Sequence, residues 1–433
     1  MLTTKYVRDN IEEIKASLKR RRSDYPIDKL LSLDAEWRDQ KTKLQKLQTE
    51  RNRASIEIAR LKKAGESAEQ NMERLPELKK EILEIESLLP SYEREINELL
   101  WNMPNVLHES VPYGESEDQN VEIKKWGVAN KKISVNHEDL LVSKDLLDIE
   151  RASKVAGARF YYLKGDLVLL EQSIIRFAID YLTKKGYKAL TTPFMLRKSF
   201  YRGVTALADF EDMLYMVTDP KELSKRKDYE RTEDDLFLIG TAEHTMAAMH
   251  AGEVFSAKDL PVKYVAVTPC FRREAGAHGR DTKGLFRVHQ FYKVEQFIFS
   301  TREESWKYFD ELIQNEEEML QKLKLPYHAI EFCTGGIGTV AARKIDLEVW
   351  FPSQQRYREM TSGSNCTEWQ SVRLDIKYDD KIGRHYVHTL NATALATTRA
   401  IVAIVENYLN DDGSISVPDV LVPYMGKRFI GSA

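Results

Sequence analysis

The chain has 433 residues, of which 42% are hydrophobic and 31% are charged, and this length predicts two or three domains with a large core. A net charge of −3 argues against a protein that coats nucleic acid with its whole surface, but it leaves room for a local basic face. No apolar run reaches the roughly 20 residues of a membrane span and the first residues lack the apolar core of a signal peptide, so we expect a cytoplasmic protein without a membrane partner.

Residues from about 28 to 100 carry a heptad repeat of apolar side chains in two runs. Gly65, between the runs, suits a helix C-cap and a chain reversal. The pattern predicts an antiparallel helical hairpin with arms on the order of 45 Å, in which Pro76 lies in a first turn and Pro90 kinks the second arm. The first run consists of Leu30, Leu33, Trp37, Leu44, Leu47, Ala54, Ile58 and Leu61, with Gln40 and Arg51 as exceptions, and the second of Leu75, Leu78, Ile82, Ile85, Leu89, Tyr92, Ile96 and Leu99.

The two predicted arms differ in charge. Residues 27–63 carry ten Lys and Arg against six Asp and Glu, whereas residues 69–100 carry four against nine. Two interpretations are open from the arms alone. Both arms are solvated faces that pair across the hairpin, or the basic arm binds a polyanion such as a nucleic acid.

The chain changes character near residue 105. The stretch WNMPNVLHESVPYG (101–114) is typical of a linker, and beyond it helices alternate with short strands without the regular repeat of a doubly wound sheet. The chain has no GxxxxGK[ST] phosphate loop. Because CTGGIGTVA (333–341) lacks the spacing of a dinucleotide fingerprint, we interpret it as a turn.

The spacing of cysteine and histidine does not indicate a metal site. Cys270, Cys333 and Cys366 lie far apart without a CxxC pair, which argues against a disulfide framework or a zinc ribbon and predicts three reduced thiols. His385 and His388 form an HxxH pattern, but in the strand predicted there the two side chains would point to different faces or heights. We therefore expect no metal pair at these histidines.

Two apolar runs, Tyr264–Phe271 and Leu285–Phe299, predict strands that are joined by a polar, Gly-containing loop. Arg272 and Glu274 fall two apart, so the first strand would present both on one face. Such a face offers guanidinium groups for phosphate oxygens, an aromatic ring for a base, and carboxylates for a cation or amine. The residues predicted to share a face of the second strand are Arg287, Phe291 and Glu295.

Two later segments carry further candidate residues. Glu359 is followed three residues later by Ser362, and a carboxylate close to a hydroxyl suits a hard cation such as Mg²⁺. Asn391 and Thr393 lie in a predicted polar turn before an amphipathic helix. Arg399 near the start of that helix opposes the helix dipole, which predicts an anionic partner. Each feature taken singly also fits a cross-strand ion pair or a helix cap.

Together these segments resemble the three signature motifs of class II aminoacyl-tRNA synthetases, and specifically the seryl-tRNA synthetase family. The first motif is similar to KKGYKALTTPFM around Pro193, the second to FRRE (271–274) with GLFRVHQFYKVEQF (284–297), and the third to LNATALATTR (390–399). TAE (241–243) and REMTSGSNCTEWQ (358–370) resemble the substrate segments of the family, and the hairpin resembles its tRNA-binding arm. The resemblance covers essentially the whole chain.

The resemblance implies an α+β fold, in which a class II antiparallel sheet flanked by helices follows the long helical hairpin. It implies a tRNA-binding domain at 1–105 with the coiled-coil arm at about 28–100, and a catalytic domain at 106–433. The implied activity joins L-serine to ATP as seryl-adenylate and transfers the seryl group to tRNA(Ser), with tRNA(Sec) as a further candidate. In this family the arm reads the long extra arm of the tRNA, and the first motif implies a homodimer in which each arm serves the other subunit.

The resemblance also assigns roles to individual residues. The acids would hold the serine ammonium group and the arginines the phosphates. The residues implied to bind ATP are Arg272, Arg273, Glu274, Arg287, Val288, Phe291, Glu359, Ser362 and Arg399, with Glu359 and Ser362 also holding Mg²⁺. Those implied to bind serine are Thr241, Ala242, Glu243, Arg272, Glu295, Asn391 and Thr393. Those implied to act directly in catalysis are Arg272, Glu274, Arg287 and Arg399.

Two positions depart from the pattern of the family. Gly240 replaces a proline found in many relatives, and Gly336 replaces an aspartate. The variant of the family that binds zinc through a core cysteine is not expected, because none of the three cysteines is predicted to lie in the pocket. The rival interpretations are an inactive RNA-binding relative, a ligase that loads a carrier protein, and a structural coiled coil, which would explain residues 30–100 and nothing after them.

Overall fold

The structure is a computed structural model in which the chain forms two units, Met1–Val106 and Leu107–Ala433. The described residues are 2–206, 211–225, 231–274 and 284–431. The predicted loop between the two arginine-bearing segments lies mostly in 275–283, outside the described residues.

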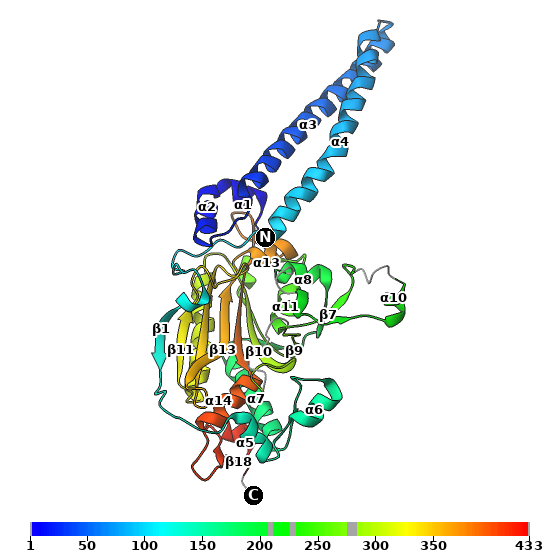
Figure 1. The fold of residues 1–433 in the computed structure, drawn as a ribbon. Helices are drawn as coiled ribbons and strands as arrows, with labels where there is room; N and C mark the ends of the chain where they lie inside the picture. The colour runs from blue at the N-terminus through cyan, green and yellow to red at the C-terminus, as the bar shows by residue number, and fades with distance from the viewer. Residues whose placement is uncertain (1, 207–210, 226–230, 275–283, 432–433) are drawn as a thin grey trace. The chain divides into compact units, whose positions relative to one another are not determined.

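The first unit contains the predicted antiparallel hairpin, which is confirmed as two long helices that run side by side (Figure 1). Gly65 ends the first of them in the left-handed conformation, with a φ of 73°, as its C-cap role predicts. Heptad leucines and isoleucines such as Leu47 and Ile82 are buried between the arms, where each contributes about 1.5–3 kcal/mol. The helices of this unit are α1 (Thr4–Asp9), α2 (Ile11–Arg20), α3 (Ile27–Ala64) and α4 (Glu69–Asn102).

The prediction that Pro76 lies in a first helical turn is wrong. Helix α4 begins at Glu69, so Pro76 lies inside it, and the helix continues through Pro90 to Asn102. A proline removes one backbone hydrogen bond from a helix interior, but packing of the apolar stripe on α3 supplies most of the stability of such a helix. Tertiary contact therefore overrides the local signal to begin the helix later.

An eight-stranded sheet dominates the second unit, and its strands are antiparallel except for the parallel pair β4–β9. The strand order is β1-β11-β12-β13-β16-β10-β9-β4, which confirms the predicted antiparallel sheet. The bounds are β1 (Val121–Trp126), β4 (Lys188–Leu190), β9 (Val262–Phe271), β10 (Gln290–Ser300), β11 (Tyr327–Glu331), β12 (Arg343–Phe351), β13 (Arg356–Asn365) and β16 (His388–Ala396).

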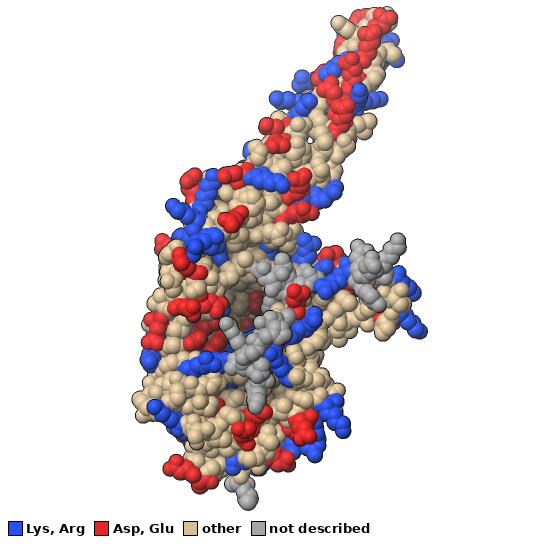
Figure 2. Space-filling view, viewed as in Figure 1, with Lys and Arg blue, Asp and Glu red and all other residues tan. Residues whose placement is uncertain are grey.

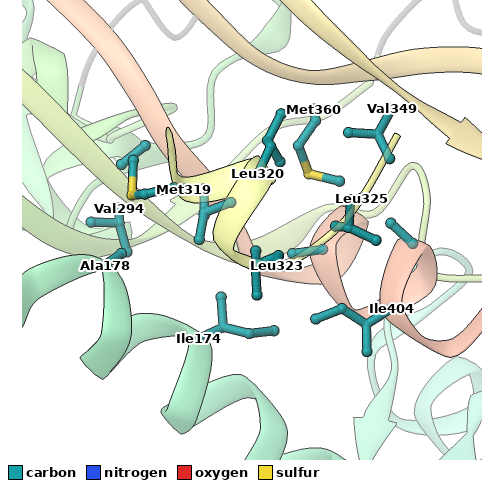
Figure 3. Packing of buried hydrophobic residues seen from close by; sticks show 14 of the residues in the cluster. Ile174, Ala178, Val294, Met319, Leu320, Leu323, Leu325, Val349, Met360 and Ile404 are labelled. Atoms are coloured by element: carbon teal, nitrogen blue, oxygen red, sulfur yellow. The ribbon is translucent and has the colours of Figure 1, made fainter. Parts of the chain in front are cut away.

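Helices cover both faces of this sheet. On one face, α7 (Asp166–Lys184), α12 (Ser305–Lys322) and α14 (Thr397–Asn407) pack into the main hydrophobic core, part of which Figure 3 shows. On the other face, α8 (Lys198–Val204), α11 (Ala242–Ala248) and α13 (Trp369–Leu374) enclose a second cluster. Strand alternation explains the division, because Val294 and Ile298 of β10 join the first core while Phe297 and Phe299 join the second.

Shorter elements complete the second unit. Among the described residues of this unit, the remaining α-helices are α5 (His137–Ser143), α6 (Ile149–Ala156), α10 (Pro220–Ser224) and α15 (Val422–Met425). Its remaining strands are β2 (Leu147–Asp148), β3 (Tyr162–Leu163), β5 (Met195–Arg197), β6 (Met216–Val217), β7 (Leu236–Leu238), β8 (Val254–Ser256), β14 (Lys377–Asp379), β15 (Arg384–Tyr386), β17 (Ile415–Ser416) and β18 (Phe429–Ile430). Among the described helices, none is both long and apolar enough to cross a membrane.

Several predicted strand positions are wrong. Strand β9 ends at Phe271, so Arg272 and Glu274 follow it, and Glu274 adopts a left-handed φ of 50° rather than an extended one. Strand β10 begins at Gln290, which leaves Arg287 in the preceding loop. In addition, the residues from 388 to 396 form β16 instead of a polar turn before α14. The polar residues in this stretch misled the prediction, because β16 is a central strand whose side chains are all buried.

Candidate functional site

A cavity of about 560 Å³ in the second unit collects most of the predicted site residues. Figure 2 shows a hollow with acidic side chains on the visible face of this unit. Ala242 does not line the cavity, because it is fully buried at the start of α11, and neither does Arg273, whose side chain is exposed. The predicted residues that line it are Thr241, Glu243, Arg272, Glu274, Arg287, Val288, Phe291, Glu295, Glu359, Ser362, Asn391, Thr393 and Arg399.

Arg272 is held in place by protein contacts on two sides. Its backbone N–H donates to the carbonyl of His289, and its Nε donates to the carbonyl of Gly240 at 3.2 Å. The guanidinium lies 5.4 Å from the centre of the Phe291 ring, within the range of a cation–π contact. Gly240 acts here through its carbonyl, which the proline of relatives would also offer, so this departure leaves the contact available.

Arg287, in the loop before β10, and Glu274, which follows β9, form an ion pair. The Nη1 of Arg287 lies 3.1 Å from the Oε2 of Glu274. The left-handed turn at Glu274 turns the chain away from β9. The two residues therefore meet even though neither lies on a strand.

The cavity face of β10 carries three residues at alternate positions, Phe291, Lys293 and Glu295. The predicted face for Phe291 and Glu295 is correct, but the buried Lys293 between them was missed, although the period of two could have revealed it. Its Nζ lies 2.5 Å from Glu295 and 3.3 Å from the hydroxyl of Thr393. Burial raises the pKa of the Glu295 carboxyl, and the Lys293 charge opposes that rise.

A bulge in β16 sets the position of Thr393. The cross-strand partner of Glu295 is Thr393, whereas that of Val294 is Leu395, so Ala394 has no partner. Such a bulge re-aims the side chains beside it. Thr393 thereby donates to Glu295 at 3.4 Å and lines the cavity.

Thr241 and Glu243 stand at the N-terminus of α11. Thr241 is the N-cap, and its hydroxyl accepts a hydrogen bond from the N–H of Glu243. The Glu243 carboxylate accepts from Gln370 at 2.9 Å and from Asn391 at 3.1 Å. Burial and the nearby charge of Glu295 raise the pKa of Glu243 to about 7.

The expectation that no cysteine reaches the pocket is wrong. Cys366 lines the cavity, and its Sγ accepts a hydrogen bond from Asn391 at 3.5 Å. Burial raises the pKa of this thiol well above its usual value, which disfavours the thiolate that a metal needs. No group of three or more His, Cys, Asp or Glu in the described part of the chain is arranged to hold a metal ion.

A bulge in β13 brings Glu359 and Ser362 to the same side of the sheet. Residues three apart on a regular strand face opposite sides. Here Glu348 pairs with Glu359 and Leu347 with Thr361, so Met360 has no partner and the alternation shifts by one. Both Glu359 and Ser362 therefore line the cavity.

Arg399 has the anionic partner that its place in the first turn of α14 predicts. Its Nη1 donates to the Glu359 carboxylate at 2.9 Å and to the Glu359 carbonyl. The Glu359 side chain is 49% exposed, and its partial desolvation raises its pKa, but the positive charges of Arg399 and Lys344 outweigh this effect and lower the pKa to about 2. Glu359 is thus ionised, and its carboxylate and the Ser362 hydroxyl both line the cavity, which is a donor set that suits a hard cation.

The segment CTGGIGTVA forms the predicted turn, and part of it also lines the cavity, from Ile337 to Ala341. Sequence reasoning missed that second role. At Gly336 a Cβ would lie 3.0 Å from Glu117 and 3.1 Å from Asn120. A larger residue at this position therefore requires those two side chains to move.

His385 and His388 lie on different strands and have different partners. His388 on β16 contacts the hydroxyl of Ser305 at 2.8 Å, whereas His385 on β15 lies 3.3 Å from Asp380. The HxxH spacing therefore places the two imidazoles against different residues, Ser305 and Asp380.

Comparisons with known proteins match both units. A family model described as the seryl-tRNA synthetase N-terminal domain matches residues 1–107, and one described as the tRNA synthetase class II core domain (G, H, P, S and T) matches residues 224–408. A serine–tRNA ligase of Pyrococcus abyssi is 44% identical over 99% of this chain and 97% of its own length.

Two solved structures are similar over nearly the full length. The crystal structure of seryl-tRNA synthetase from Pyrococcus horikoshii complexed with ATP aligns with a TM-score of 0.91 at 42% identity, covering 99% of each chain. The cytoplasmic serine–tRNA ligase of Naegleria fowleri in complex with AMP aligns with a TM-score of 0.86 at 36% identity, covering 97% of this chain and 95% of that one.

Proposed function

The chain belongs to the seryl-tRNA synthetase family, and from this we propose that it activates L-serine with ATP to seryl-adenylate and then transfers the seryl group to the 3′ end of tRNA(Ser). The observation that carries the proposal is one cavity lined by three arginines from separate elements, the buried Glu295 and the partly buried Glu243. The arginines suit a triphosphate and the acids suit an ammonium group.

In the first step an oxygen of the serine carboxylate attacks the α-phosphorus of ATP. An O–P bond forms to the serine, the bond to the β-phosphate breaks, and pyrophosphate leaves. The carboxylate is already ionised, so this step needs no general base. It does need charge neutralised on both reactants, and we assign that role to Arg272, with Arg287 and Arg399 on the phosphate tail.

The nucleotide base would lie against Phe291, with Glu274 at the adenine end and Val288 beside it. The 5.4 Å contact between Arg272 and the Phe291 ring supports this, because it keeps the ring next to the guanidinium that we assign to the α-phosphate. Arg287 is paired with Glu274 at 3.1 Å. We infer that ATP takes over both partners of this ion pair.

Glu359 and Ser362 are the residues we propose to hold Mg²⁺. An ionised carboxylate and a hydroxyl on one wall fit a hard cation that keeps waters and phosphate oxygens as its other ligands. Bound Mg²⁺ supplies further neutralisation of the phosphates. Arg399 donates a hydrogen bond to the Glu359 carboxylate at 2.9 Å. We propose that its guanidinium binds the phosphates when ATP is bound.

The serine pocket is proposed to be Thr241, Glu243, Glu295, Asn391 and Thr393. Buried carboxylates suit the ammonium group, and polar groups dedicated to a hydroxyl would reject alanine because they would be left unpaired. Threonine must instead be excluded by size. The positive charge of the buried Lys293 offsets the negative charge that Glu295 brings to this pocket.

The proposed tRNA-binding surface is the basic arm. Charged side chains of both signs cover the visible face of the hairpin in Figure 2. Ion pairs such as Arg74–Glu50 do cross it, but other cations remain available for phosphates. Among the described residues, those of α3 that are exposed and have no ion-pair partner include Lys43, Lys46, Arg53, Lys62 and Lys63.

We propose tRNA(Sec) as a second substrate, because an arm that contacts the backbone and shape of a tRNA does not read its anticodon. We also propose a homodimer. An apolar cavity of about 330 Å³ is lined by residues near the first motif such as Pro193 and Phe200, and the exposed Met195 and Met249 adjoin it, which suits burial against a second copy. A cytoplasmic location remains part of the proposal.

The test is pyrophosphate exchange with ATP and Mg²⁺ across the twenty amino acids, followed by charging of total tRNA. Serine-dependent exchange with charging is expected. Exchange without charging would favour a ligase that loads a carrier protein, and no exchange at all would favour an inactive relative.

A further inference from the structure

His137 is a buried histidine that lies far from every motif in the sequence and yet contacts the second of them. It is the first residue of α5 and is 6% exposed. Its Nε2 accepts a hydrogen bond from the backbone N–H of Leu285 at 3.2 Å. Because a backbone amide only donates, Nε2 carries no proton, and the proton of the neutral ring lies on Nδ1.

The chain is shaped to receive this imidazole. Gly284, next to Leu285, has a φ of 74°, in the left-handed region that favours glycine. A Cβ at Gly284 would lie 2.2 Å from the Nε2 of His137. Any side chain at position 284 would therefore have to displace the ring.

The other side of the ring faces α14. The Nδ1 of His137 lies 3.4 Å from Oε1 of Glu406, a contact that is electrostatic because it is longer than a normal hydrogen bond. The Glu406 carboxylate is fully buried and accepts from the N–H and the hydroxyl of Ser353 at 2.9 and 2.7 Å. His137 thus joins the segment that begins at Leu285 to α14 and to the turn between β12 and β13.

The segment that begins at Leu285 and helix α14 both carry cavity residues. Phe286, Arg287 and Val288 follow Leu285 directly, and Arg399 lies in the first turn of α14. The Phe286 ring lies 5.1 Å from the guanidinium of Arg399, so the two elements already meet at the cavity. A shift of Leu285 would move these residues together.

We propose that His137 is a positioning residue for ATP: it fixes the segment from Leu285 to Val288 against α14, and so sets the distance between the two arginines that hold the triphosphate. The inference rests on the proposed function. Without the ring acceptor, the buried N–H of Leu285 would be left unsatisfied, and the segment would move to recover a partner.

The serine pocket is built from other elements, namely the N-terminus of α11 and strands β10 and β16. The loss of His137 should therefore affect ATP and leave serine binding largely alone. A histidine that served only to fill the core would instead change stability and treat both substrates alike.

The experiment measures KM for ATP and for serine in pyrophosphate exchange, together with Tm, for the full-length protein. His137→Ala is expected to raise KM for ATP about tenfold while KM for serine stays within about twofold. His137→Gln, whose amide oxygen can accept from Leu285, is expected to recover most of the loss. His250→Ala is the matched control, since His250 contacts Glu253 and Tyr264 away from the cavity, and it should lower Tm without separating the two KM values.

A second variant distinguishes loss of the His137 contact from misfolding of His137→Ala. Gly284→Ala should raise KM for ATP as His137→Ala does, because its methyl group displaces the ring. In the double variant the ring is gone, so the combined loss should be clearly smaller than the product of the single losses. Multiplicative losses, or equal effects of His137→Ala on both KM values, would overturn the inference. No serine-dependent exchange by the wild-type protein would overturn the proposed function and the inference together, whereas active wild type with unchanged KM for ATP in His137→Ala would overturn the inference alone.

Discussion

Removal of the Arg272 side chain should strongly reduce adenylate formation and leave tRNA binding unchanged. The Nε of Arg272 is already committed to the carbonyl of Gly240, which aims the rest of the guanidinium into the cavity. The proposed ligands of that guanidinium are the α-phosphate of ATP and the carboxylate of serine. Arg272→Ala therefore removes contacts to both reactants at once.

The size of the effect follows from these two contacts. A hydrogen bond to a charged group contributes about 1.5–3 kcal/mol, so two of them contribute about 3–6 kcal/mol to the transition state. At about 1.4 kcal/mol for each factor of ten, kcat/KM for exchange should fall by roughly 10²–10⁴. Arg272→Lys should recover little, because an ammonium group cannot keep the Gly240 contact and reach both reactants.

The assay is pyrophosphate exchange, with tRNA binding measured on filters. Binding of tRNA should be unchanged, since the proposed tRNA surface is the arm of the first unit. Arg273→Ala is the matched control: its side chain is exposed and does not line the cavity, so exchange should stay within about threefold of wild type. Exchange by Arg272→Ala within a few-fold of wild type would refute the assignment.

Three further predictions concern the acid, the cation and the arm. The pKa of Glu243 is raised to about 7, and only its ionised form pairs with the serine ammonium, so kcat/KM for serine should rise with pH up to about 7 and then level off. Glu243→Gln should remove that inflection. A wild-type profile that is flat between about pH 5.5 and 7 would contradict this role. Glu359→Gln should raise the Mg²⁺ concentration for half-maximal exchange by about tenfold, and an unchanged Mg²⁺ titration would exclude Glu359 as a ligand. Replacement of residues 41–89 by a short Gly linker keeps the hydrophobic cluster that contains Leu30 and Ile96. This variant should preserve pyrophosphate exchange and lose charging of tRNA(Ser). Normal charging would show that the arm serves another partner.

Local sequence was sufficient for the hairpin. The heptad spacing of apolar residues and the glycine at position 65 act within one or two helical turns, so their consequences can be deduced without knowledge of the rest of the chain. The same is true of Phe291 and Glu295, whose even spacing gives them a common face on β10. The identities of the site residues were also available in the sequence, through the resemblance of their motifs to a known family.

Strand ends and bulges were decided by tertiary structure. Glu359 and Ser362 share the cavity only because Met360 is bulged against β12, and Thr393 meets Glu295 only because Ala394 is bulged against β10. A bulge depends on the register with a neighbouring strand that is distant in sequence, and period-two reasoning about one strand cannot foresee it. The predicted run Tyr264–Phe271 ends where β9 ends, and the error was to place Arg272 and Glu274 on that strand, since both follow it.

Burial and partners across the chain were likewise outside the reach of the sequence. The cavity position of Cys366, the buried charge of Lys293 beside Glu295 and the contact of His137 with Leu285 each join residues from separate elements. Local patterns identified the hairpin and the common face of Phe291 and Glu295, but they misplaced the start of α4 and interpreted β16 as a turn. Which side chains meet in the cavity depends on long-range packing, because distance, desolvation and the pKa shifts that follow are not set by neighbours in the chain.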